Sequence, residues 1–496
     1  MNAEKQKFPA PEYAKNVLSE CFEDAKSYFL DALIDVNYAH AIMLAEQGII
    51  TTQELKSILS ALNKIDREKI QKTQYDGSFE DLFFLLQREI QKNCEQEDAA
   101  GKLHTARSRN DIDVTIYRMK LRDYNLKLLF ELLRLRSNLI NLADKYKDAL
   151  MPAYTHTQPA QPTTLGHFLI AMVENLNRDT KRLISAFDNI NTCPLGACAI
   201  TTTGFPINRF RTAELLGFTA PTRNSYASIS SVDYFTETMS AVIVLMINIG
   251  KFAYEFLLMA MQEFDVIHLS DGFVQGSSIM PQKRNPVALE HVRAIASKTL
   301  GQALGVMTAI HNTPFGDIND VEDDLQPLIY KAMHDAIRTI NLFSATLKDA
   351  SFNTSKLKQM AAENFITVTE LADELVRREN LSFKIAHEIV GKAVTKALDS
   401  SNQLTIQILN EAAKETTNRE LNLDEATLQE ILSPEHFVNI RTIYGGPASE
   451  ELTQSILFEK NQLDSDEAEI KQKQNQLINA RKQLTRKVEE LLHTRV

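Results

Sequence analysis

The chain has 496 residues, 44% of them hydrophobic, and is therefore long enough to bury a large core. Its formal net charge of −11 argues against nucleic acid as the main partner, because phosphate binding depends on clusters of lysine and arginine. With only 16 glycines and no tryptophan, the composition favours helices over a turn-rich β architecture.

The sequence also argues against export and membrane insertion. The first residues hold no apolar core of the length that a signal peptide needs, and the longest apolar run, 241–250, covers half a membrane span. The four cysteines are too sparse for a disulfide framework. Cys193 and Cys198 lack the second pair or nearby histidine of a metal site, so we interpret the cysteines as small buried thiols. We therefore predict a soluble, cytoplasmic protein with neither a membrane nor a nucleic-acid partner.

Long helices dominate the expected secondary structure. Residues 111–151 contain neither glycine nor proline, and leucines recur there at steps of three, four or seven residues. A continuous helix of that length would extend for about 60 Å. Further long helices are expected at 165–191, 232–264 and 286–311, and the charged end from Asp464 is expected to form a solvated helix.

These elements predict an all-α fold with three helical domains. Residues 1–110 hold shorter helices, residues 111–365 hold the long ones, and residues 366–496 begin with another compact helical segment. Helices this long bury their apolar faces only in an extended bundle. We therefore predict a long central helix bundle.

Three polar segments interrupt the helices, and each lies at an expected helix end, where loops carry function on a rigid frame. The first is HTARSRND, which ends at Asp111. An N-cap role for Asn110 or Asp111 would explain one of its residues. Arg107 and Arg109 flank Ser108, and arginine beside hydroxyl and amide donors is what a carboxylate ligand requires. The segment indicates an anion site, with a simple helix cap as the alternative.

The second polar segment is THTQPAQPTT, residues 155–164, whose two prolines exclude a helix interior. A single histidine such as His156 is by default a surface residue that pins a loop. Histidine also exchanges protons near neutral pH, and Thr155 and Gln158 are uncharged hydrogen-bonding groups that can orient a ligand. Both interpretations stay open for this segment.

The third polar segment is GSSIMPQKRNP, residues 276–286. As a purely structural segment it would be a flexible linker in which Asn285 caps the next helix and Pro286 takes its first position. That interpretation leaves Ser277 and Lys283 unexplained. A mobile loop that presents a serine and a cation can close over a substrate, exclude water and complete a site.

Together the three segments resemble the signature regions of the aspartase/fumarase superfamily, whose members cleave C–N or C–O bonds and release fumarate. GSSIMPQKRNP matches the superfamily pattern GSSxMPxKxNP at every specified position. HTARSRND is similar to the HTGRSRND of argininosuccinate lyases, with Ala106 in place of the glycine, and YTHTQPAQPTT is similar to their YTHxQxAQP. Further similarity in AHAIML, PLGACA, LADELVRRENLSFKIAHEIVG and IYGGPA extends the resemblance to nearly the whole chain.

The resemblance implies a role for each matching residue. Ser277 corresponds to the general base that removes a proton beside a substrate carboxylate, while Lys283 and Asn285 hold that carboxylate and stabilise the aci-carboxylate that forms. His156 and Glu290 match a histidine–glutamate pair that helps to protonate the departing nitrogen. The substrate-binding positions of the family are matched by Ser108, Arg109, Asn110, Thr155 and Gln158.

The resemblance also implies an assembly. In this superfamily three regions from three different subunits form each active site, so we expect a homotetramer that shares its sites between subunits. The implied substrate is a small dicarboxylate. Neither a metal nor an organic cofactor is expected, since the histidines are dispersed and no glycine-rich phosphate loop is present.

Several positions depart from the argininosuccinate lyase pattern. Where the family has YNxDxQEDK the chain has DINDVEDDLQP, so that Asp317, Glu322 and Leu325 replace a tyrosine, a glutamine and a lysine. Val232 replaces an arginine, and Phe83 stands where histidine is common. The two new acids would suit a leaving amine with more positive charge and fewer carboxylates.

We therefore predict β-elimination of the argininosuccinate lyase type, which converts argininosuccinate to arginine and fumarate and belongs to arginine biosynthesis. One alternative is a paralogue that releases fumarate from a different N-substituted aspartate. Another is a catalytically silent structural protein on the same scaffold. The presence of Ser277, Lys283 and His156 favours an enzyme. Adenylosuccinate lyase is less favoured, because nothing in the sequence indicates a purine pocket.

Overall fold

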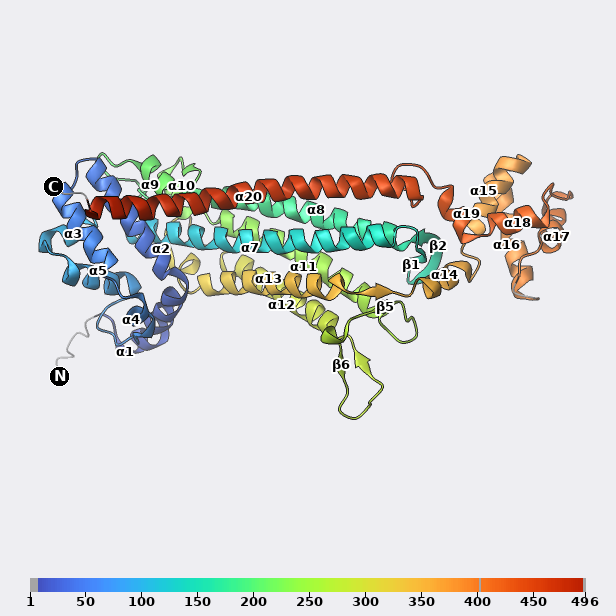
Figure 1. Cartoon of the computed structure of the whole chain (residues 1–496), viewed down its shortest axis with the longest axis horizontal. Helices are drawn as coiled ribbons and strands as arrows, with labels where there is room; N and C mark the ends of the chain where they lie inside the picture. Colours follow the sequence, from blue (N-terminus) through green and yellow to red (C-terminus); the bar gives the residue numbers. More distant parts are fainter. Residues whose placement is uncertain (1–7, 401–402, 494–496) are drawn as a thin grey trace.

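The structure is a computed structural model that describes residues 8–400 and 403–493, and its helices form an elongated rod (Figure 1). Long helices run along the rod and confirm the predicted all-α class. They are α7 (Arg109–Lys145), α8 (Leu165–Ile190), α11 (Asp233–Met259), α12 (Val287–Ala309), α13 (Gln326–Lys348) and α20 (Ser449–His493).

The other helices, all short except α2, cover the two ends of the rod (Figure 1). The end that holds the start of α7 carries α1 (Pro11–Tyr13), η1 (a π-helix, Ala14–Leu18), α2 (Ser19–Glu46), α3 (Thr52–Asn63), α4 (Arg67–Lys72), α5 (Leu82–Asn93), α6 (Glu97–Lys102), α9 (Arg209–Leu215) and α10 (Ser225–Ser230). The opposite end carries α14 (Thr354–Ala362), α15 (Val368–Glu379), α16 (Phe383–Leu398), α17 (Ile406–Thr417), α18 (Glu425–Ile431) and α19 (Pro434–Asn439).

The strands are short and occur in two-stranded pairs. β1 (Leu150–Thr155) pairs antiparallel with β2 (Gln158–Thr164), and β6 (Gln275–Gly276) pairs antiparallel with β7 (Arg284–Asn285). The remaining pairs are β3 (Thr192–Cys193) with β4 (Ala220–Pro221) and β5 (Ile267–His268) with β8 (Ser351–Phe352). Two single 3-10 turns, η2 (Asp271–Phe273) and η3 (Asn319–Val321), complete the elements.

Helix α7 differs at both ends from the predicted helix at 111–151. It begins at Arg109 with Ser108 as its N-cap, so the expected cap at Asn110 or Asp111 is wrong. It ends at Lys145, because the chain turns there and continues into the β1–β2 hairpin. The turn is closed by the start of α8, where a Cβ added to Gly166 would lie 2.6 Å from the Cα of Lys147. Only glycine permits so close an approach.

The other long helices begin or end one to five residues inside their predicted ranges. Helix α8 ends at Ile190, α11 spans 233–259 rather than 232–264, and α12 spans 287–309 rather than 286–311. The predicted cap of α12 is wrong by one residue, since Pro286 is the N-cap and Asn285 belongs to β7. A frayed or irregular last turn makes helix ends the least predictable part of an element.

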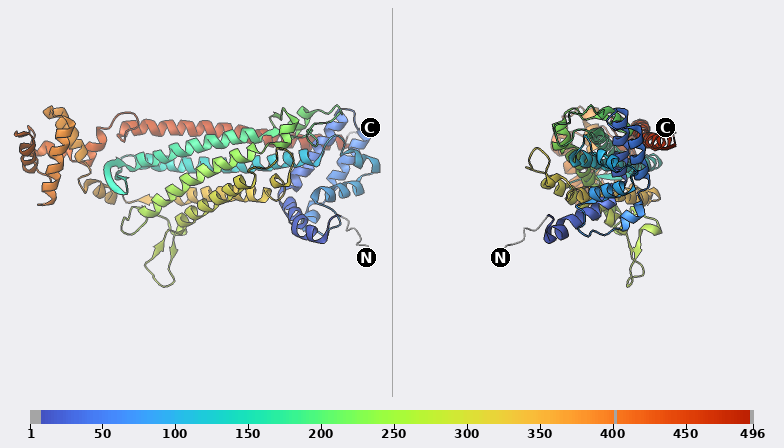
Figure 2. Two further views of the ribbon diagram at one scale, coloured as in Figure 1. Left: turned by 180° about the vertical axis from the view of Figure 1, so that it is seen from behind. Right: turned by 90° about the vertical axis from the view of Figure 1, so that its left-hand side faces the viewer.

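The buried apolar side chains form two main clusters. The larger one joins the N-terminal helices to the bundle and includes residues of α20 such as Ile470 and Leu484, so the segment from Asp464 is helical as predicted but buries one stripe. The smaller cluster lies within residues 371–431. Domain boundaries at 110 and 365 stay predictions. In the left view of Figure 2, α20 (red) runs along the upper edge of the rod.

A buried ion cluster fastens α20 to the bundle. Arg136 of α7 is fully buried and donates from Nη1 to Asp466 of α20, while its Nη2 lies 3.7 Å from Glu459 of the same helix. Thr180 of α8 accepts a further hydrogen bond from Arg136 at 3.2 Å. Buried charges are tolerated only when they are paired in this way, so the cluster fixes how the C-terminal helix packs on the bundle.

Candidate active site

The predicted residues Ser108, Arg109 and Asn110 lie at the start of α7. Ser108 Oγ donates to Asn110 Oδ1 at 2.9 Å, and Asn110 Nδ2 donates to the carbonyl oxygen of Ala199 at 3.1 Å. Just before them, Ala106 has a φ of +59°. This left-handed conformation is the one that glycine adopts without strain, which gives a physical reason for the glycine of the family pattern.

Asp111 anchors a second loop to this helix. Its Oδ2 accepts the N–H groups of Gly196 and Cys198 at 2.7 and 2.8 Å, and its Oδ1 accepts the N–H of Ser108 at 2.9 Å. Burial raises the pKa of the Asp111 carboxyl to about 6, and the backbone donors oppose that rise. The PLGACA segment is thereby held against the HTARSRND segment.

Arg109 is surrounded by carboxylates in the folded chain. Its guanidinium lies 2.6 Å from Asp81, 3.3 Å from Glu80 and 3.8 Å from Asp113. These partners were not predicted from the sequence, although Glu80 and Asp81 stand side by side in FEDLFF, residues 79–84. Its charge is therefore already compensated within the chain, and its predicted role in binding substrate stays a prediction.

A second group of acids lies near Arg109 and contains two of the positions that depart from the family pattern. Burial, followed by the charge and hydrogen bond of Asp317, raises the pKa of the Glu322 carboxyl to about 8, and Arg109 opposes this rise. The neighbouring Asp323 accepts a hydrogen bond from Tyr117 Oη at 3.1 Å. Carboxyl groups therefore outnumber cations at this end of α7, and their crowding favours the protonated form of Glu322.

His156 lies at the tip of the β1–β2 hairpin, at the other end of α7. Thr155 pairs with Gln158 across the hairpin, and the two residues between them, His156 and Thr157, have φ values of +51° and +63°. Two consecutive left-handed residues are typical of a type I′ turn, which favours asparagine and glycine. A histidine and a β-branched threonine in these positions are strained, and such strain is concentrated at functional sites.

Ser277 begins the loop of a second hairpin, directly after strand β6, and the hairpin is formed by β6 and β7. Its Oγ accepts the N–H groups of Met280 at 3.0 Å and Ile279 at 3.3 Å. Lys283 is exposed, and no acid in the described part of the chain pairs with its ammonium group. Asn285 ends the hairpin opposite Gln275. The predicted base and a lysine without an acidic partner in the described residues therefore lie in the same hairpin loop.

The three groups of predicted residues lie apart within one chain. Helix α7 has 37 residues, so Ser108 and the hairpin at His156 are separated by about its length of 55 Å. The hairpin that carries Ser277 projects sideways from the rod in each view (Figures 1 and 2). Glu290 follows this hairpin in the first turn of α12, and the described residues show no ion pair between it and His156.

The other departures from the family pattern have different surroundings. Leu325 is only 5% exposed and packs in the core at the start of α13, so it faces inward rather than toward a ligand. Val232 is half-buried and packs against the same core before α11. The ring of Phe83 lies 5.5 Å from the ring of His104 and lines a small cavity.

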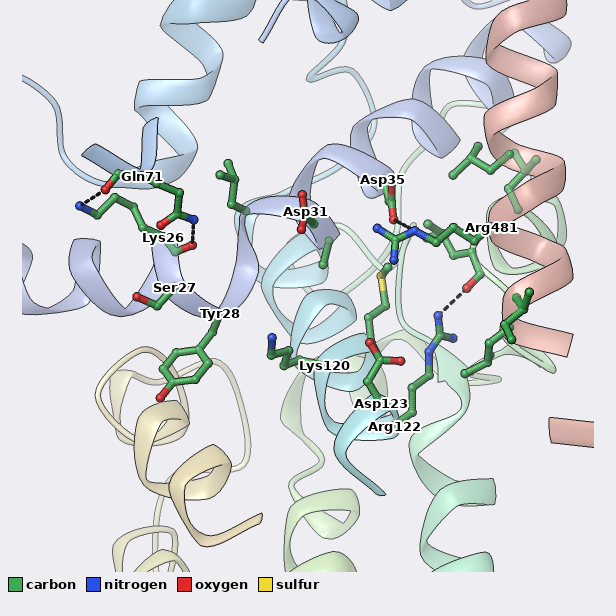
Figure 3. Close-up of a pocket in the computed structure, with 18 residues that line it drawn as sticks. Lys26, Ser27, Tyr28, Asp31, Asp35, Gln71, Lys120, Arg122, Asp123 and Arg481 are labelled. Carbon is green, nitrogen blue, oxygen red and sulfur yellow. Dashed lines mark hydrogen bonds and ion pairs between the residues drawn. The ribbon is translucent and has the colours of Figure 1, made fainter. Parts of the chain in front are cut away.

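A cavity of about 300 Å³ lies between α2, α7 and α20, away from the predicted residues (Figure 3). Arg481 lies 3.7 Å from Asp35, and burial raises the pKa of that carboxyl to about 6. Arg122 donates to the carbonyl oxygen of Leu216 at 2.7 Å. None of the predicted site residues is among those that line this cavity, so it is separate from the candidate active site.

One group of side chains has donor atoms close enough to hold a metal ion among the residues that the structure describes: Glu370, Glu374 and His436. The two glutamates are ion-paired with Arg377, Arg378 and Arg441. These arginines already compensate the carboxylates, and the group lies at the α15 end of the rod. It belongs to none of the three predicted segments.

Two family models match the chain. Residues 7–301 match a model described as Lyase, and residues 365–439 match a model described as Argininosuccinate lyase C-terminal. Argininosuccinate lyase 2 from Agrobacterium fabrum is 41% identical over 477 residues, which cover 95% of this chain and 94% of the relative. Argininosuccinate lyase from Methanocaldococcus jannaschii is 36% identical over 453 residues, covering 91% of each chain.

Solved structures resemble this fold along almost its full length. An EDDS lyase in complex with formate has a TM-score of 0.88 and 32% identity, covering 98% of this chain and 96% of that one. A class II fumarase from Schistosoma mansoni has a TM-score of 0.66 at 16% identity, covers 84% of this chain and 90% of that one, and shares the fold alone. The matched segments, the relatives and the three signature regions agree with the resemblance seen in the sequence. The chain belongs to the argininosuccinate lyase family, a family of carbon–nitrogen lyases within the aspartase/fumarase superfamily.

Proposed function

We propose that this protein cleaves argininosuccinate into arginine and fumarate by β-elimination. The observation that carries the proposal is the surroundings of Ser277, whose Oγ accepts two backbone N–H groups close in sequence to the unpaired Lys283. A serine hydroxyl is ordinarily a poor base. Hydrogen bonds donated to the oxygen stabilise its deprotonated form, so this hairpin suits proton abstraction.

The reaction follows from placing this hairpin over a carbon acid. Ser277 Oγ takes the proton from the carbon beside a substrate carboxylate, and the electron pair moves into that carboxylate. Lys283 and Asn285 stabilise the negative charge that develops there. The C–N bond then breaks, its electrons leave with the nitrogen, and the carbon–carbon double bond of fumarate forms. The pair His156 and Glu290 assists protonation of the nitrogen.

The complete site requires more than one subunit, because the three signature regions lie apart in a single chain. We place them together in a homotetramer in which each site takes one region from each of three subunits.

Helix α11 is the one helix in the described residues that is long and apolar enough by length and composition to cross a membrane, yet Leu245 and Ile249 are buried in the bundle. The exposed apolar residues Ile247, Tyr254 and Leu304 of α11 and α12 offer a face for further copies. A cytoplasmic location stays a prediction.

Mixed tetramers test this shared site. Ser277→Ala and His156→Asn variants are each expected to be nearly inactive when purified alone. After co-expression, some sites combine a wild-type Ser277 with a wild-type His156 from another subunit, and random assembly restores roughly a quarter of full activity. If co-expressed tetramers stay as inactive as the separate variants, the shared-site arrangement is wrong, whereas the reaction itself is unaffected.

A second candidate substrate is favoured by the acids near Arg109. Asp317 and Glu322 replace an uncharged tyrosine and glutamine of the family pattern, and Asp323 adds a further carboxylate. A leaving amine with an additional positive charge and no carboxylate of its own would be attracted there. The EDDS lyase structures, 32% identical to this chain, are named for a compound other than argininosuccinate.

A substrate panel separates the two candidates. Fumarate release is followed by its ultraviolet absorbance while argininosuccinate, adenylosuccinate, aspartate and N-(aminoalkyl)aspartates are offered to the purified protein. The highest kcat/KM with argininosuccinate is the expected result. A preference for N-(aminoalkyl)aspartates would establish the second candidate, and no turnover of any N-substituted aspartate would contradict both.

A further inference from the structure

Arg107 is a buried cation without an ion-pair partner in the described residues. Its side chain is 8% exposed, and its Nε and Nη1 atoms are buried without a hydrogen-bond acceptor in the structure. Burial lowers the pKa of the guanidinium to about 10, which leaves it charged at neutral pH. An isolated buried charge costs several kcal/mol or more, by order of magnitude, so a compensating group is expected nearby.

The protein supplies little of that compensation. Asp111 is the acid that attracts Arg107, but its two oxygens already accept three backbone N–H groups. His40 donates from Nε2 to the carbonyl oxygen of Thr105 at 2.9 Å, and burial lowers the pKa of this imidazole to about 3. Burial also lowers the pKa of His104. Both rings are therefore neutral at physiological pH, and neither adds a competing positive charge.

Arg107 faces a small cavity with a second unpartnered group in its wall. The centre of a water-sized sphere has about 10 Å³ of space in this cavity, so the cavity is larger than a single water molecule. His104 also lines it, and the buried Nδ1 of this ring has no partner in the structure. Phe83, Gln87 and Ala100 form part of the remaining wall. The wall of this small cavity thus contains one cation, Arg107, and one potential N–H donor, His104.

We propose that this cavity binds a monatomic anion of the chloride type. The Nε–H and Nη1–H groups of Arg107 and the Nδ1–H tautomer of His104 donate to the ion. A cavity this small favours a monatomic ion over the larger carboxylate and phosphate groups. A water molecule would satisfy hydrogen bonds but leave the guanidinium charge uncompensated, which is why a halide is favoured over water.

The cavity lies beside a hollow on the surface and close in sequence to the start of α7. An open hollow on the surface shares Gln87 and Ala100 with this cavity, so the two lie next to each other at α5 and α6. Arg107 directly precedes Ser108 and Arg109 in the chain. The bound anion therefore fixes the residue that lies two positions before the first residue of α7.

Bromide provides a direct test, because it replaces chloride and scatters anomalously. Crystals of the full chain soaked in sodium bromide are expected to show an anomalous peak within hydrogen-bond distance of Arg107 Nε and His104 Nδ1. Ala100→Val, which fills the cavity and keeps Arg107, is expected to remove that peak. Bromide peaks on the surface with none at Arg107 would overturn the proposal.

A solution measurement gives an independent reading. Thermal unfolding is followed as chloride replaces gluconate at constant ionic strength. The wild type is expected to show a saturable rise in Tm of roughly 1 °C, because an ion that binds only the folded state stabilises it. Arg107→Met removes the charge of the site, and Arg67→Met removes one charge from an exposed arginine of the same region as a matched control.

The wild type and Arg67→Met should respond equally to chloride, and Arg107→Met should not respond. An equal response in all three proteins, or none in the wild type, contradicts the proposal. If Arg107→Met does not fold, Ala100→Val takes its place in the same measurement.

Discussion

Ser277 illustrates, at the scale of single residues, how backbone geometry can prepare a weak acid for use as a base. The hairpin directs two N–H groups at its Oγ, and the nearest lysine in the motif has no acidic partner in the described residues. Both features favour the deprotonated oxygen. Arg109 shows the opposite case, because three carboxylates already compensate its charge before any substrate is bound.

Removal of the Ser277 hydroxyl should affect turnover far more than stability. For Ser277→Ala we expect turnover to fall by ~10² to 10⁴, the usual contribution of a group that transfers a proton. The hairpin is exposed, so the free energy of unfolding should change by less than ~0.5 kcal/mol. Ser278→Ala, the adjacent and exposed serine, is the matched control and should keep near-normal turnover. Equal losses in the two variants would remove Ser277 from the mechanism.

Glu322 should make stability depend on pH in a defined direction. Its pKa is about 8 in the folded protein and 4.5 in its ordinary state, so the folded state holds a proton that the unfolded state releases. The resulting stabilisation is complete below pH 4.5 and is lost as pH rises to about 8. Glutamine cannot ionise, so the free energy of unfolding of Glu322→Gln should not fall for this reason as the pH rises from 4.5 to 8. Over this range the wild type should lose at least ~1.4 kcal/mol more than the variant.

Urea denaturation at pH 5, 7 and 9 measures this difference for the wild type and Glu322→Gln. Glu263→Gln alters an exposed glutamate and is the control, whose stability should follow that of the wild type at each pH. Parallel pH profiles for the wild type and Glu322→Gln would show that Glu322 does not hold an extra proton in the folded state.

The turns matter most at the scale of elements, because each predicted site residue sits where a helix or strand ends. The β1–β2 hairpin and the segment just before α7 hold residues in conformations that ordinary side chains avoid, among them Ala106, His156 and Thr157. Such conformations persist only because the flanking elements impose them. The rigid bundle thus carries short, strained connections that present the polar side chains.

Ala106→Gly should stabilise the protein by relieving one of these conformations. A left-handed alanine costs about 1–2 kcal/mol, and glycine avoids this cost. The greater entropy of glycine in the unfolded state offsets part of the resulting stabilisation. We therefore expect the free energy of unfolding to rise by ~0.5–1 kcal/mol in a urea titration. Ala171→Gly, on an exposed part of α8, should instead lower it by ~1 kcal/mol. A lower urea midpoint for Ala106→Gly would contradict the predicted strain.

The whole molecule is a rod that keeps its chemical groups apart, and its C-terminal helix runs back along the bundle to the end where the chain begins (Figure 1). Helix α20 joins the main core through Ile470 and Leu484 and through the buried ion cluster at Arg136. This packing links residues more than 300 positions apart in sequence. Loss of that cluster should therefore loosen the attachment of a complete helix.

Arg136→Met tests the ion cluster. The substitution leaves Asp466 and Glu459 buried without their cation, and we expect the free energy of unfolding to fall by about 3–5 kcal/mol. The double variant Arg136→Met with Asp466→Leu should recover part of this loss, since one unpaired charge is removed. Chemical denaturation of the two single variants and the double variant gives the coupling between them. Additive effects would show that the two side chains do not stabilise each other.

Helix periodicity and the three polar segments were sufficient to predict the all-α class, the long bundle and the family. Leucine spacing reports an apolar face, and a helix that lacks glycine and proline over dozens of residues has few alternatives. The helix ends were less predictable: α7 ends at Lys145 because of the close contact between Gly166 and Lys147, which is a tertiary contact.

The amino-acid sequence by itself determined the family and the all-α class, and it predicted which residues carry the chemistry, since a signature such as GSSIMPQKRNP is local and does not depend on its surroundings. Only the tertiary structure decided what those residues face. It surrounds Arg109 with carboxylates from α7 and from the residues just before α5, turns Leu325 into the core, and places Arg107 against a small cavity. The physical reason is that burial and charge pairing depend on elements distant in sequence, which a local pattern does not contain.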